Sequence, residues 1–511
     1  MKLLFDLQAL QNESRNRGIG RYVKSLFDAL ARRSDVELYG LLNGAMHETL
    51  GPAHDHVAGK IGAERVLVFP GVGETKLEVP DNLHRWRLSQ AAYEAFVAES
   101  GCDALLVGSA VEGFIDGTSL SLRAPDALYL KAVVLHDLIP LTDVDRYLSW
   151  DKARAWYFDR VAHVEDADIA LANSDSSRGE GLQILGFTPD SVVTISAAFD
   201  TEIFNQDPAA VAALPQKFGI SRPFVMHASA LDPRKNFDGL IKAFAALPLE
   251  TRRKHQLVLV GGGSDSAKDD LMALAHQLGL SSNDLILTGF VPDSDLVHLL
   301  RACRLFVFPS FHEGFGLPAL EAMACGCPTI GSNVTSIPEV IGNPSYTFDP
   351  TDTAAIAKLM HELLADDAAW EKARTHAIEQ AGRFSWDSVA DRAVEAFRNA
   401  LSHRQPVVQD YPSARRMARH VASRVDLNDC PGGDVESLAR CLAAAEDELV
   451  EKRALALPKK GKTWRIEGPF DSSYSLALVN RETARAMAVL GWQVALHSTE
   501  GPGDFPANPD F

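Results

Sequence analysis

Short apolar runs alternate with helix-like segments twice along the chain, and this alternation limits the folds open to it. The runs of the first half are KLLFDL, VELYGLL, ALLVG, AVVLHD, DIALAN and VVTIS, and those of the second half are PFVMHAS, QLVLV, LILTGFV, RLFVFPS and PTIGS. Runs that are apolar at nearly every position are typical of parallel strands, because helices cover both faces of a parallel sheet. The sequence therefore predicts an α/β protein with two Rossmann-like lobes that face a central, ligand-binding cleft.

The later part of the chain changes in character. Residues 402–463 hold charged helical stretches around the turn CPGGD, and residues 464–498 again read as strand, loop, helix and strand. A lone unit of this kind cannot cover both faces of its strands, which indicates a second α/β module; the alternative is an extra unit packed on the main body. We also expect a chain that ends at residue 401 to remain folded. The predicted parts are an N-terminal lobe (1–200), a C-terminal lobe (201–385), a helix closing the two-lobed module (386–401), a helical connector (402–463) and the truncated start of a second module (464–511).

The composition excludes several classes of protein. Lys and Arg number 50 and Asp and Glu number 68, so the formal net charge is −18, and a chain this acidic repels nucleic acid. Six cysteines are too few for a disulfide scaffold and fit reducing surroundings. No apolar run approaches the ~20 residues that span a bilayer. We expect a cytoplasmic protein that is at most peripheral to the inner membrane face.

The stretch FVFPSFHEGFGLPALEAMACGCPTIGS carries the strongest functional signal. A buried strand leads into the loop HEGFG, in which Gly314 and Gly316 let a ligand approach the backbone closely. Pro318 suits the first turn of the following helix, whose free N–H groups favour an anion. Glu313 and Glu321 flank this anion site and can accept hydrogen bonds from the hydroxyls of a sugar and a ribose. The alternative is that Glu321 only complements the helix dipole and that Glu313 is a loop charge.

A basic pair, Arg234 and Lys235, stands between a strand and a helix in HASALDPRKNFDGLIKAF. Fixed cations stabilise the negative charge that develops on a departing nucleoside diphosphate. The pair is therefore a candidate for leaving-group stabilisation, and the alternative is a solvated basic turn.

Together these motifs resemble those of the retaining glycosyltransferases of family 4, which have the GT-B fold with an acceptor lobe followed by a donor lobe. The resemblance covers residues 1–400, about four-fifths of the chain. It implies that Glu321 holds the ribose of the nucleotide and that Glu313 holds the transferred sugar. It further implies backbone contacts to the sugar and the pyrophosphate from Gly314, Phe315 and Gly316.

The same resemblance assigns roles to residues outside this stretch. Lys235 would contact the diphosphate, whereas the arginine that family members often carry six residues earlier is Ser229 here, which leaves Arg234 as the candidate second cation. His136, at the end of the run AVVLHD, would contact the transferred sugar, with a purely structural role as the alternative. The remaining donor-side positions are Val291 beside the nucleobase, and Gly18 and Gly20 in the glycine loop near the donor phosphate and the acceptor.

The activity that the resemblance implies is transfer of a hexose, with mannose preferred, from a nucleotide-sugar to a growing glycan or lipid-linked saccharide. The segments DPRKN and HDLIPL resemble those of bacterial polysaccharide and O-antigen mannosyltransferases, which favours GDP-mannose over UDP- and dTDP-sugars. No residue stands out as a covalent nucleophile, so we expect same-face attack assisted by the leaving phosphate.

Two other classes of function remain as alternatives. One is a non-catalytic GT-B scaffold or specificity module, which the presence of Glu313, Glu321 and Lys235 disfavours. The other is a nicotinamide oxidoreductase, which the incomplete glycine fingerprint disfavours. We expect no catalytic metal and no cofactor besides the donor substrate, because D-x-D matches such as Asp143 with Asp145 recur by chance along the chain.

Overall fold

The computed structural model describes residues 1–207, 217–402, 404, 412–456, 460–468, 475–489 and 492–498. The chain divides into two compact units. The first holds Met1–Val133, Trp150–Asp168 and Phe397–Phe511, and the second holds Val134–Ser149 and Ile169–Ala396. Each unit is thus built from separate chain segments and is described by itself. The domain boundaries predicted from the sequence stay predictions.

The first sheet has seven strands in the order β3-β2-β1-β4-β5-β6-β7. The pairs β1–β2, β1–β4, β2–β3, β4–β5 and β6–β7 are parallel, as the apolar runs predict. The sequence analysis missed β3, whose apolar run VLVF is among the shorter ones. The strands are β1 (Lys2–Asp6), β2 (Glu37–Asn43), β3 (Val66–Phe69), β4 (Ala104–Val107), β5 (Leu130–Leu135), β6 (Ile169–Ala172) and β7 (Val192–Thr194).

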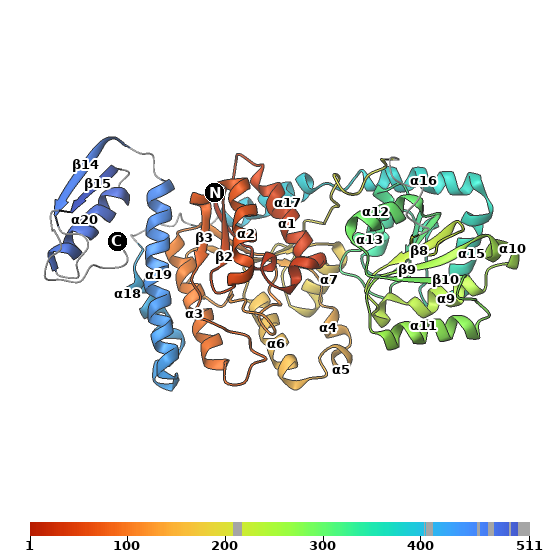
Figure 1. Cartoon of the computed structure of the whole chain (residues 1–511), viewed down its shortest axis with the longest axis horizontal. Helices are drawn as coiled ribbons and strands as arrows, with labels where there is room; N and C mark the ends of the chain where they lie inside the picture. The colour runs from red at the N-terminus through yellow and green to blue at the C-terminus, as the bar shows by residue number, and fades with distance from the viewer. Residues whose placement is uncertain are drawn as a thin grey trace. The chain divides into compact units, whose positions relative to one another are not determined.

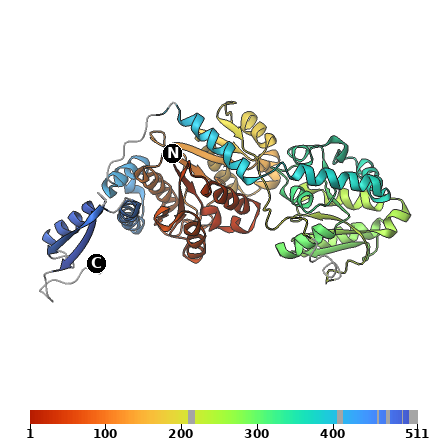
Figure 2. The same ribbon diagram turned by 90° about the horizontal axis from the view of Figure 1, so that it is seen from above.

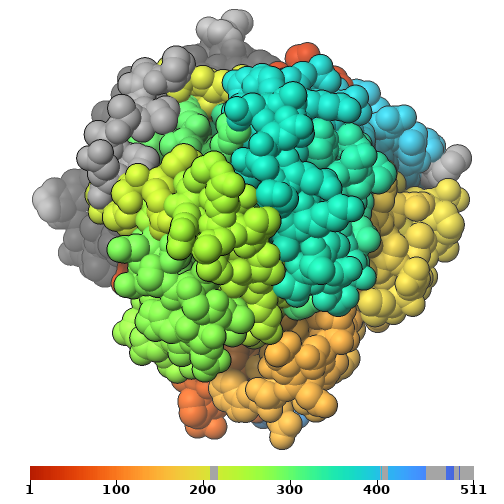
Figure 3. Space-filling view, turned by 90° about the vertical axis from the view of Figure 1, so that its right-hand side faces the viewer, coloured from red at the N-terminus to blue at the C-terminus, as the bar shows by residue number. Residues whose placement is uncertain are grey.

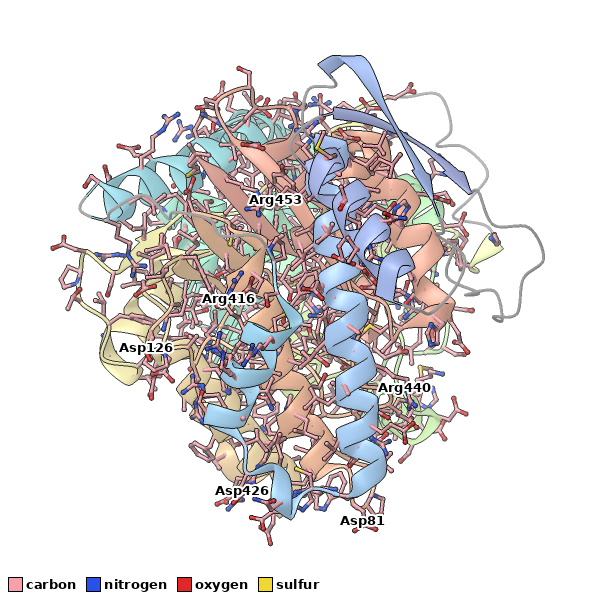
Figure 4. The ribbon with its side chains drawn as sticks, turned by 90° about the vertical axis from the view of Figure 1, so that its left-hand side faces the viewer. Asp81, Asp126, Arg416, Asp426, Arg440 and Arg453 are labelled. Atoms are coloured by element: carbon pink, nitrogen blue, oxygen red, sulfur yellow. The ribbon has the colours of Figure 1, made fainter. Side chains whose placement is uncertain are left out.

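Within the first unit, α3 is covered by two helices from the predicted connector. Apolar side chains are buried all along α3, whereas α18 carries one apolar stripe that includes Met417 and Val421. The views agree that α18 and α19 lie beside α3 (Figures 1, 2 and 4). Besides α20, which is described below, the helices of this unit are α1 (Gly18–Ala31), α2 (His47–Ile61), α3 (Leu83–Ser100), α6 (Asp151–Glu165), α18 (Ala414–Arg424) and α19 (Gly432–Ala456).

Polar contacts fix the same two helices to the first unit. Arg416 of α18 forms a 2.6 Å ion pair with Glu99 of α3. Glu448 of α19 accepts a 2.9 Å hydrogen bond from the N–H of Val68 in the edge strand β3. An edge strand exposes unpaired backbone groups that proteins normally cover, so α19 completes the first unit at this edge.

The second sheet has six strands in the order β10-β9-β8-β11-β12-β13, and all neighbours are parallel. Strand order reverses between β8 and β11, and ligands of open α/β sheets bind beside the carboxyl ends of strands at such a point. The strands are β8 (Phe224–Ala228), β9 (Gln256–Val260), β10 (Leu285–Gly289), β11 (Leu305–Phe308), β12 (Thr329–Ser332) and β13 (Thr347–Phe348).

Helices cover both faces of the second sheet, with α9 and α11 on one side and α12 and α13 on the other (Figure 1). The green surface of this unit lies directly against the cyan surface of its C-terminal helices (Figure 3), consistent with contacts of α15 with α9 and α10. The helices are α4 (Ile139–Thr142), α5 (Val144–Tyr147), α7 (Asp175–Ile184), α9 (Phe237–Ala245), α10 (Leu249–Lys254), α11 (Asp265–Gln277), α12 (Asp293–Ala302), α13 (Leu317–Ala324), α14 (Ile337–Ile341), α15 (Thr353–Ala365), α16 (Asp367–Ala381) and α17 (Trp386–Leu401), the last of which runs into the first unit.

A separate two-stranded parallel sheet follows α19. It consists of β14 (Lys460–Gly468) and β15 (Trp492–Ser498), joined through α20 (Ser475–Val489). The predicted strand, helix and strand of residues 464–498 are confirmed, and the loop predicted between β14 and α20 lies outside the described residues. Across the described ranges, none of the helices combines the length and apolar character that crossing a bilayer requires.

Candidate active site

The reversal of strand order in the second sheet brings the two predicted motifs together. The loop after β8 forms the short 3-10 helix η4 (Pro233–Lys235), and the loop after β11 contains Glu313. Asn236 has a left-handed φ of 56° and donates hydrogen bonds to the carbonyls of Pro309 (3.1 Å) and Pro350 (2.8 Å). This side chain therefore fixes the β8 loop against the β11 loop.

Lys235, Arg234 and Glu313 form a charge triad in which Lys235 and Glu313 are buried and Arg234 is partly exposed. The Lys235 Nζ lies 2.5 Å from Glu313 Oε1, and Arg234 Nη1 lies 3.0 Å from Glu313 Oε2. Burial alone would raise the pKa of Glu313, but the charges of Lys235 and Arg234 hold it below its ordinary value. Asp232 Oδ2 lies 3.6 Å from Arg234 Nε, so the two cations of this group face two carboxylates and their charges balance.

The loop from Glu313 to Gly316 is held by contacts that the sequence analysis did not anticipate. Gly316 has a φ of 109° and caps the start of α13, a backbone conformation that favours glycine. Ser336 donates hydrogen bonds to the carbonyls of Glu313 (2.9 Å) and Phe315 (2.8 Å). The hydroxyl of Thr335 accepts a 3.2 Å hydrogen bond from the N–H of Glu313, and Thr335 has a φ of 52°. Positive φ is strained for a β-branched residue, and such strain concentrates at functional sites.

The end of β5 lies directly against the same loop. A Cβ added to Gly314 would lie 2.6 Å from the carbonyl oxygen of His136 and 2.8 Å from Asp137 Oδ2. Ser174 donates a 2.6 Å hydrogen bond to the Gly314 carbonyl, and Ser177 donates a 2.8 Å hydrogen bond to the His136 carbonyl. The structure thus brings His136 to the Glu313 loop, and glycine at 314 is required by this close approach.

Ser229 occupies the position where the resemblance leads one to expect an arginine. Its hydroxyl lies 2.8 Å from His227 Nε2. Burial, and then the charge of Lys235, lower the pKa of His227 to about 4, so this imidazole is neutral near pH 7. The guanidinium of Arg234 reaches Glu313, the carboxylate that Lys235 also contacts, and its role as the second cation stays a prediction.

The other predicted site residues fall into two groups. Glu321 lies on α13 and Val291 follows β10, and both side chains are buried. Gly18 and Gly20 belong to the first unit, at the start of α1. A Cβ on Gly20 would lie 2.3 Å from the Ser14 carbonyl oxygen, so glycine there has a packing reason. The roles of these residues towards a donor stay predictions.

The first sheet has its own reversal of strand order, between β1 and β4, and a buried carboxylate lies beside it. Glu112 Oε1 accepts hydrogen bonds from Ser14 (2.7 Å) and Ser109 (2.9 Å). Burial, followed by the charge of Asp116, raises the pKa of Glu112 to about 7. The sequence analysis missed this residue, although a Glu shortly after a buried strand run is a signal that could have found it.

No cluster of three or more His, Cys, Asp or Glu side chains suited to a metal ion occurs in the part of the chain that the structure describes. Asp143, from the D-x-D match, accepts a hydrogen bond from the N–H of Arg146 and so caps α5. Metal independence of the reaction stays a prediction.

Comparison with known sequences places the chain among glycosyltransferases. The family model described as "Glycosyl transferases group 1" matches residues 213–384. The Escherichia coli "Serotype-specific mannosyltransferase WbdA" is 34% identical over 79% of this chain and 49% of its own. The E. coli "O-antigen chain mannosyltransferase B" is 30% identical over 78% of this chain and 100% of its own. The chain spans about half the length of the WbdA relatives that it matches.

Comparison with solved structures confirms the predicted GT-B fold. Anabaena HepE, in complex with UDP and glucose, has a TM-score of 0.56 at 20% identity and covers 78% of this chain and 100% of its own. WaaG, "a glycosyltransferase involved in lipopolysaccharide biosynthesis", has a TM-score of 0.53 at 14% identity and covers 77% of this chain and 99% of its own. At these identities the likeness shows the fold alone.

Proposed function

This chain belongs to the glycosyl transferases group 1 family, and from that premise we propose that it transfers mannose, with retention, from GDP-mannose to a growing glycan. The names of the WbdA and O-antigen relatives support mannose as the sugar and a surface polysaccharide as the product. The guanine nucleotide and a lipid-linked form of the acceptor rest on the sequence resemblance. A cytoplasmic location, at most peripheral to the inner membrane face, is part of the same proposal.

The charge triad of Lys235, Arg234 and Glu313 is the observation that carries this proposal. Cleavage of the bond between the sugar and the nucleotide places negative charge on the leaving diphosphate. The triad provides two fixed cationic side chains, and α13 begins immediately after Gly316, so its free N–H groups add a positive partial charge. Charge that is fixed before the reaction stabilises the developing negative charge without reorganisation.

Each residue has a distinct part in this mechanism. Lys235 donates to the diphosphate, and Arg234 is the second cation. Glu313 orients both cations and accepts from hydroxyls of the transferred sugar, while His136 approaches that sugar from the end of β5. Glu321 accepts from the ribose hydroxyls. The acceptor hydroxyl attacks the face that the diphosphate leaves and passes its proton to a departing phosphate oxygen, so retention needs no covalent intermediate.

The test separates donor binding from turnover. Glu321→Ala should weaken donor binding by roughly 1.5–3 kcal/mol, the worth of a hydrogen bond to a charged group. Lys235→Ala should instead lower kcat by about 10²–10³-fold. Lys358→Ala, on an exposed face of α15, is the matched control and should change neither quantity.

The assay should offer GDP-mannose and UDP-sugars with and without a mannose oligosaccharide acceptor, and should record nucleotide release and product linkage. A Lys235→Ala variant with near-wild-type kcat contradicts the leaving-group role. Donor binding without turnover for every acceptor would favour a non-catalytic module. Turnover with UDP-sugars alone would contradict the donor assignment while leaving the transferase assignment intact.

A further inference from the structure

A pocket of about 940 Å³ opens in the second unit beside the triad, and Arg234 is the one residue of its lining that the mechanism above uses. Its walls come from the segment containing α4 and α5, from the segment joining η4 to α9, and from Phe311 and His312 after β11. No residue of the Glu313–Glu321 stretch lines it. The volume lies within the ~300–1,000 Å³ of small-molecule sites, so the pocket is large enough for an organic ligand.

Two aromatic rings, those of Phe311 and Tyr147, add to an apolar lining that also includes Ile139, Leu231, Phe237 and Leu271. Phe311 is 42% exposed although it lies just after a buried strand, and the half-buried Tyr147 ends α5. Burial, and then the charge of Asp232, raise the pKa of the Tyr147 phenol, so its hydroxyl stays a neutral donor and acceptor. Both rings offer a flat apolar face, and Tyr147 adds a polar hydroxyl.

The charges that line the pocket disfavour an anionic ligand. Arg146 faces Asp143 at 3.8 Å, and Arg234 is engaged by Asp232 (3.6 Å) and by Glu313. Carboxylates outnumber cations among the lining side chains, which are Asp143, Asp232, Asp238 and Asp270 against Arg146, Arg234 and Lys242. The lining therefore offers a phosphate no surplus of positive charge, whereas a neutral ligand rich in hydroxyls would find many acceptors.

The pocket shares a wall with the reaction centre. Arg234 Nη1 donates to the His312 carbonyl (2.9 Å) and to Glu313 Oε2 (3.0 Å), and the Arg234 carbonyl accepts from the N–H of Phe311 (2.8 Å). A ligand in the pocket thus lies one side chain away from Glu313, on the far side of Arg234.

We propose that this pocket binds a sugar residue of the acceptor glycan, with Phe311 and Tyr147 against the pyranose faces and the aspartates accepting from its hydroxyls. The inference rests on the proposed function, because it supplies the second substrate of that reaction. It assigns Phe311 and Tyr147 to acceptor binding and not to catalysis.

The experiment uses the full chain and mannotriose as the probe. Mannotriose binding should be measured by calorimetry, and the KM for mannotriose should be measured in the transfer assay. Phe311→Ala and Tyr147→Ala should each raise the dissociation constant and the KM by about 5- to 30-fold, the range of an ordinary aromatic contact residue. Tyr147→Phe keeps the ring and should lose less than Tyr147→Ala. Phe158→Ala removes a similarly exposed ring from α6 and should change neither constant.

Competition shows which substrate the pocket serves. GDP should not displace mannotriose, and the affinity for GDP should stay within about twofold in Tyr147→Ala. The inference is overturned if GDP displaces mannotriose, or if the dissociation constant and KM for mannotriose are unchanged in both alanine variants. In either case, transfer by the wild-type chain would leave the proposed function intact. If the wild-type chain transfers from no nucleotide-sugar, the proposed function fails, and direct mannotriose binding by the wild type and the variants still decides the pocket.

Discussion

Substitution of Leu442 by alanine should destabilise the first unit, because α19 is part of its core. Leu442 is buried, with 4% of its surface exposed, and α19 packs on α3 and on the edge strand β3. A large-to-small change at such a site costs about 2–5 kcal/mol, the sum of the lost burial and the cavity left behind. Domains of 150–250 residues lose ~2–4 °C in Tm for each kcal/mol. The expected fall in Tm is therefore about 4–20 °C.

Arg440→Ala is the matched control on the same helix. Arg440 is labelled on α19 in Figure 4, and its side chain is 67% exposed, with described contacts to the exposed Glu436 and to Ser437 of the same helix. Surface changes of this kind stay within about 0.5 kcal/mol, so its Tm should shift by no more than ~2 °C.

Two measurements should accompany each other, because a chain with two units need not unfold in one step. Calorimetry gives the Tm, and hydrogen exchange of the α3 peptide (83–100) reports on the helix that α18 and α19 cover. Leu442→Ala should speed exchange in α3, whereas Arg440→Ala should leave it unchanged.

The sequence suggested that a chain ending at residue 401 remains folded, but the packing of α18 and α19 on α3 predicts that such a chain is destabilised. A chain ending at residue 401 lacks the helices that cover α3 and should expose its apolar side chains, whereas a chain ending at 456 keeps them. Equal, cooperative unfolding of the first unit in both truncated chains, or a Leu442→Ala shift no larger than that of Arg440→Ala, would refute the reasoning.

Three further outcomes are expected. Gly314→Ala should lower kcat/KM by about 100-fold, because its Cβ would lie 2.6 Å from the His136 carbonyl oxygen and a displacement of the site by ~1 Å costs about that much. The control Gly262→Ala, whose Cβ would meet nothing within 4 Å, should leave kcat/KM nearly unchanged. An equal fall in kcat/KM for both variants would contradict the argument. The pKa of Glu112 is raised from 4.5 to about 7, first by burial and then by the charge of Asp116, so its contribution to stability is fully present below about pH 4.5 and is lost as the pH rises to about 7. Above that pH, Glu112→Gln should be more stable than wild type by up to ~3 kcal/mol in denaturant titrations. The effect is excluded if the free energies of unfolding of Glu112→Gln and wild type change with pH in parallel. Mannose transfer should survive excess EDTA, and abolition with rescue by Mn²⁺ would show that a metal takes part.

The parallel sheets, and Lys235 and Glu313 as site residues, could be predicted from short stretches of sequence. Runs such as RLFVFPS are apolar at every strand position, which identifies them as strands covered on both faces. The family resemblance assigned Lys235 and Glu313 to one donor site, and the structure agrees with the rule that residues just past the carboxyl ends of such strands gather at one edge of the sheet.

The supports of the site could not be predicted in the same way. Ser336 and Thr335 hold the Glu313 loop from a different strand connection, and Ser174 reaches Gly314 across 140 positions of sequence. Serine and threonine are common in loops, so their sequence context carries little information on which distant carbonyl they bind.

The sequence by itself determined the alternation of strands and helices, the parallel direction of the sheets and the residue types of the charge triad, because these depend on local periodicity and on residues next to strand ends. Only the tertiary structure decided that α18 and α19 complete the first unit, since an amphipathic stripe shows that a helix is buried on one side but not which surface it covers. The tertiary structure likewise decided that the Lys235 and Arg234 charges converge on one carboxylate, and that Phe311 and Tyr147 meet in one pocket. Contacts between residues far apart in the chain depend on the order of the strands, which the local pattern of a sequence does not contain.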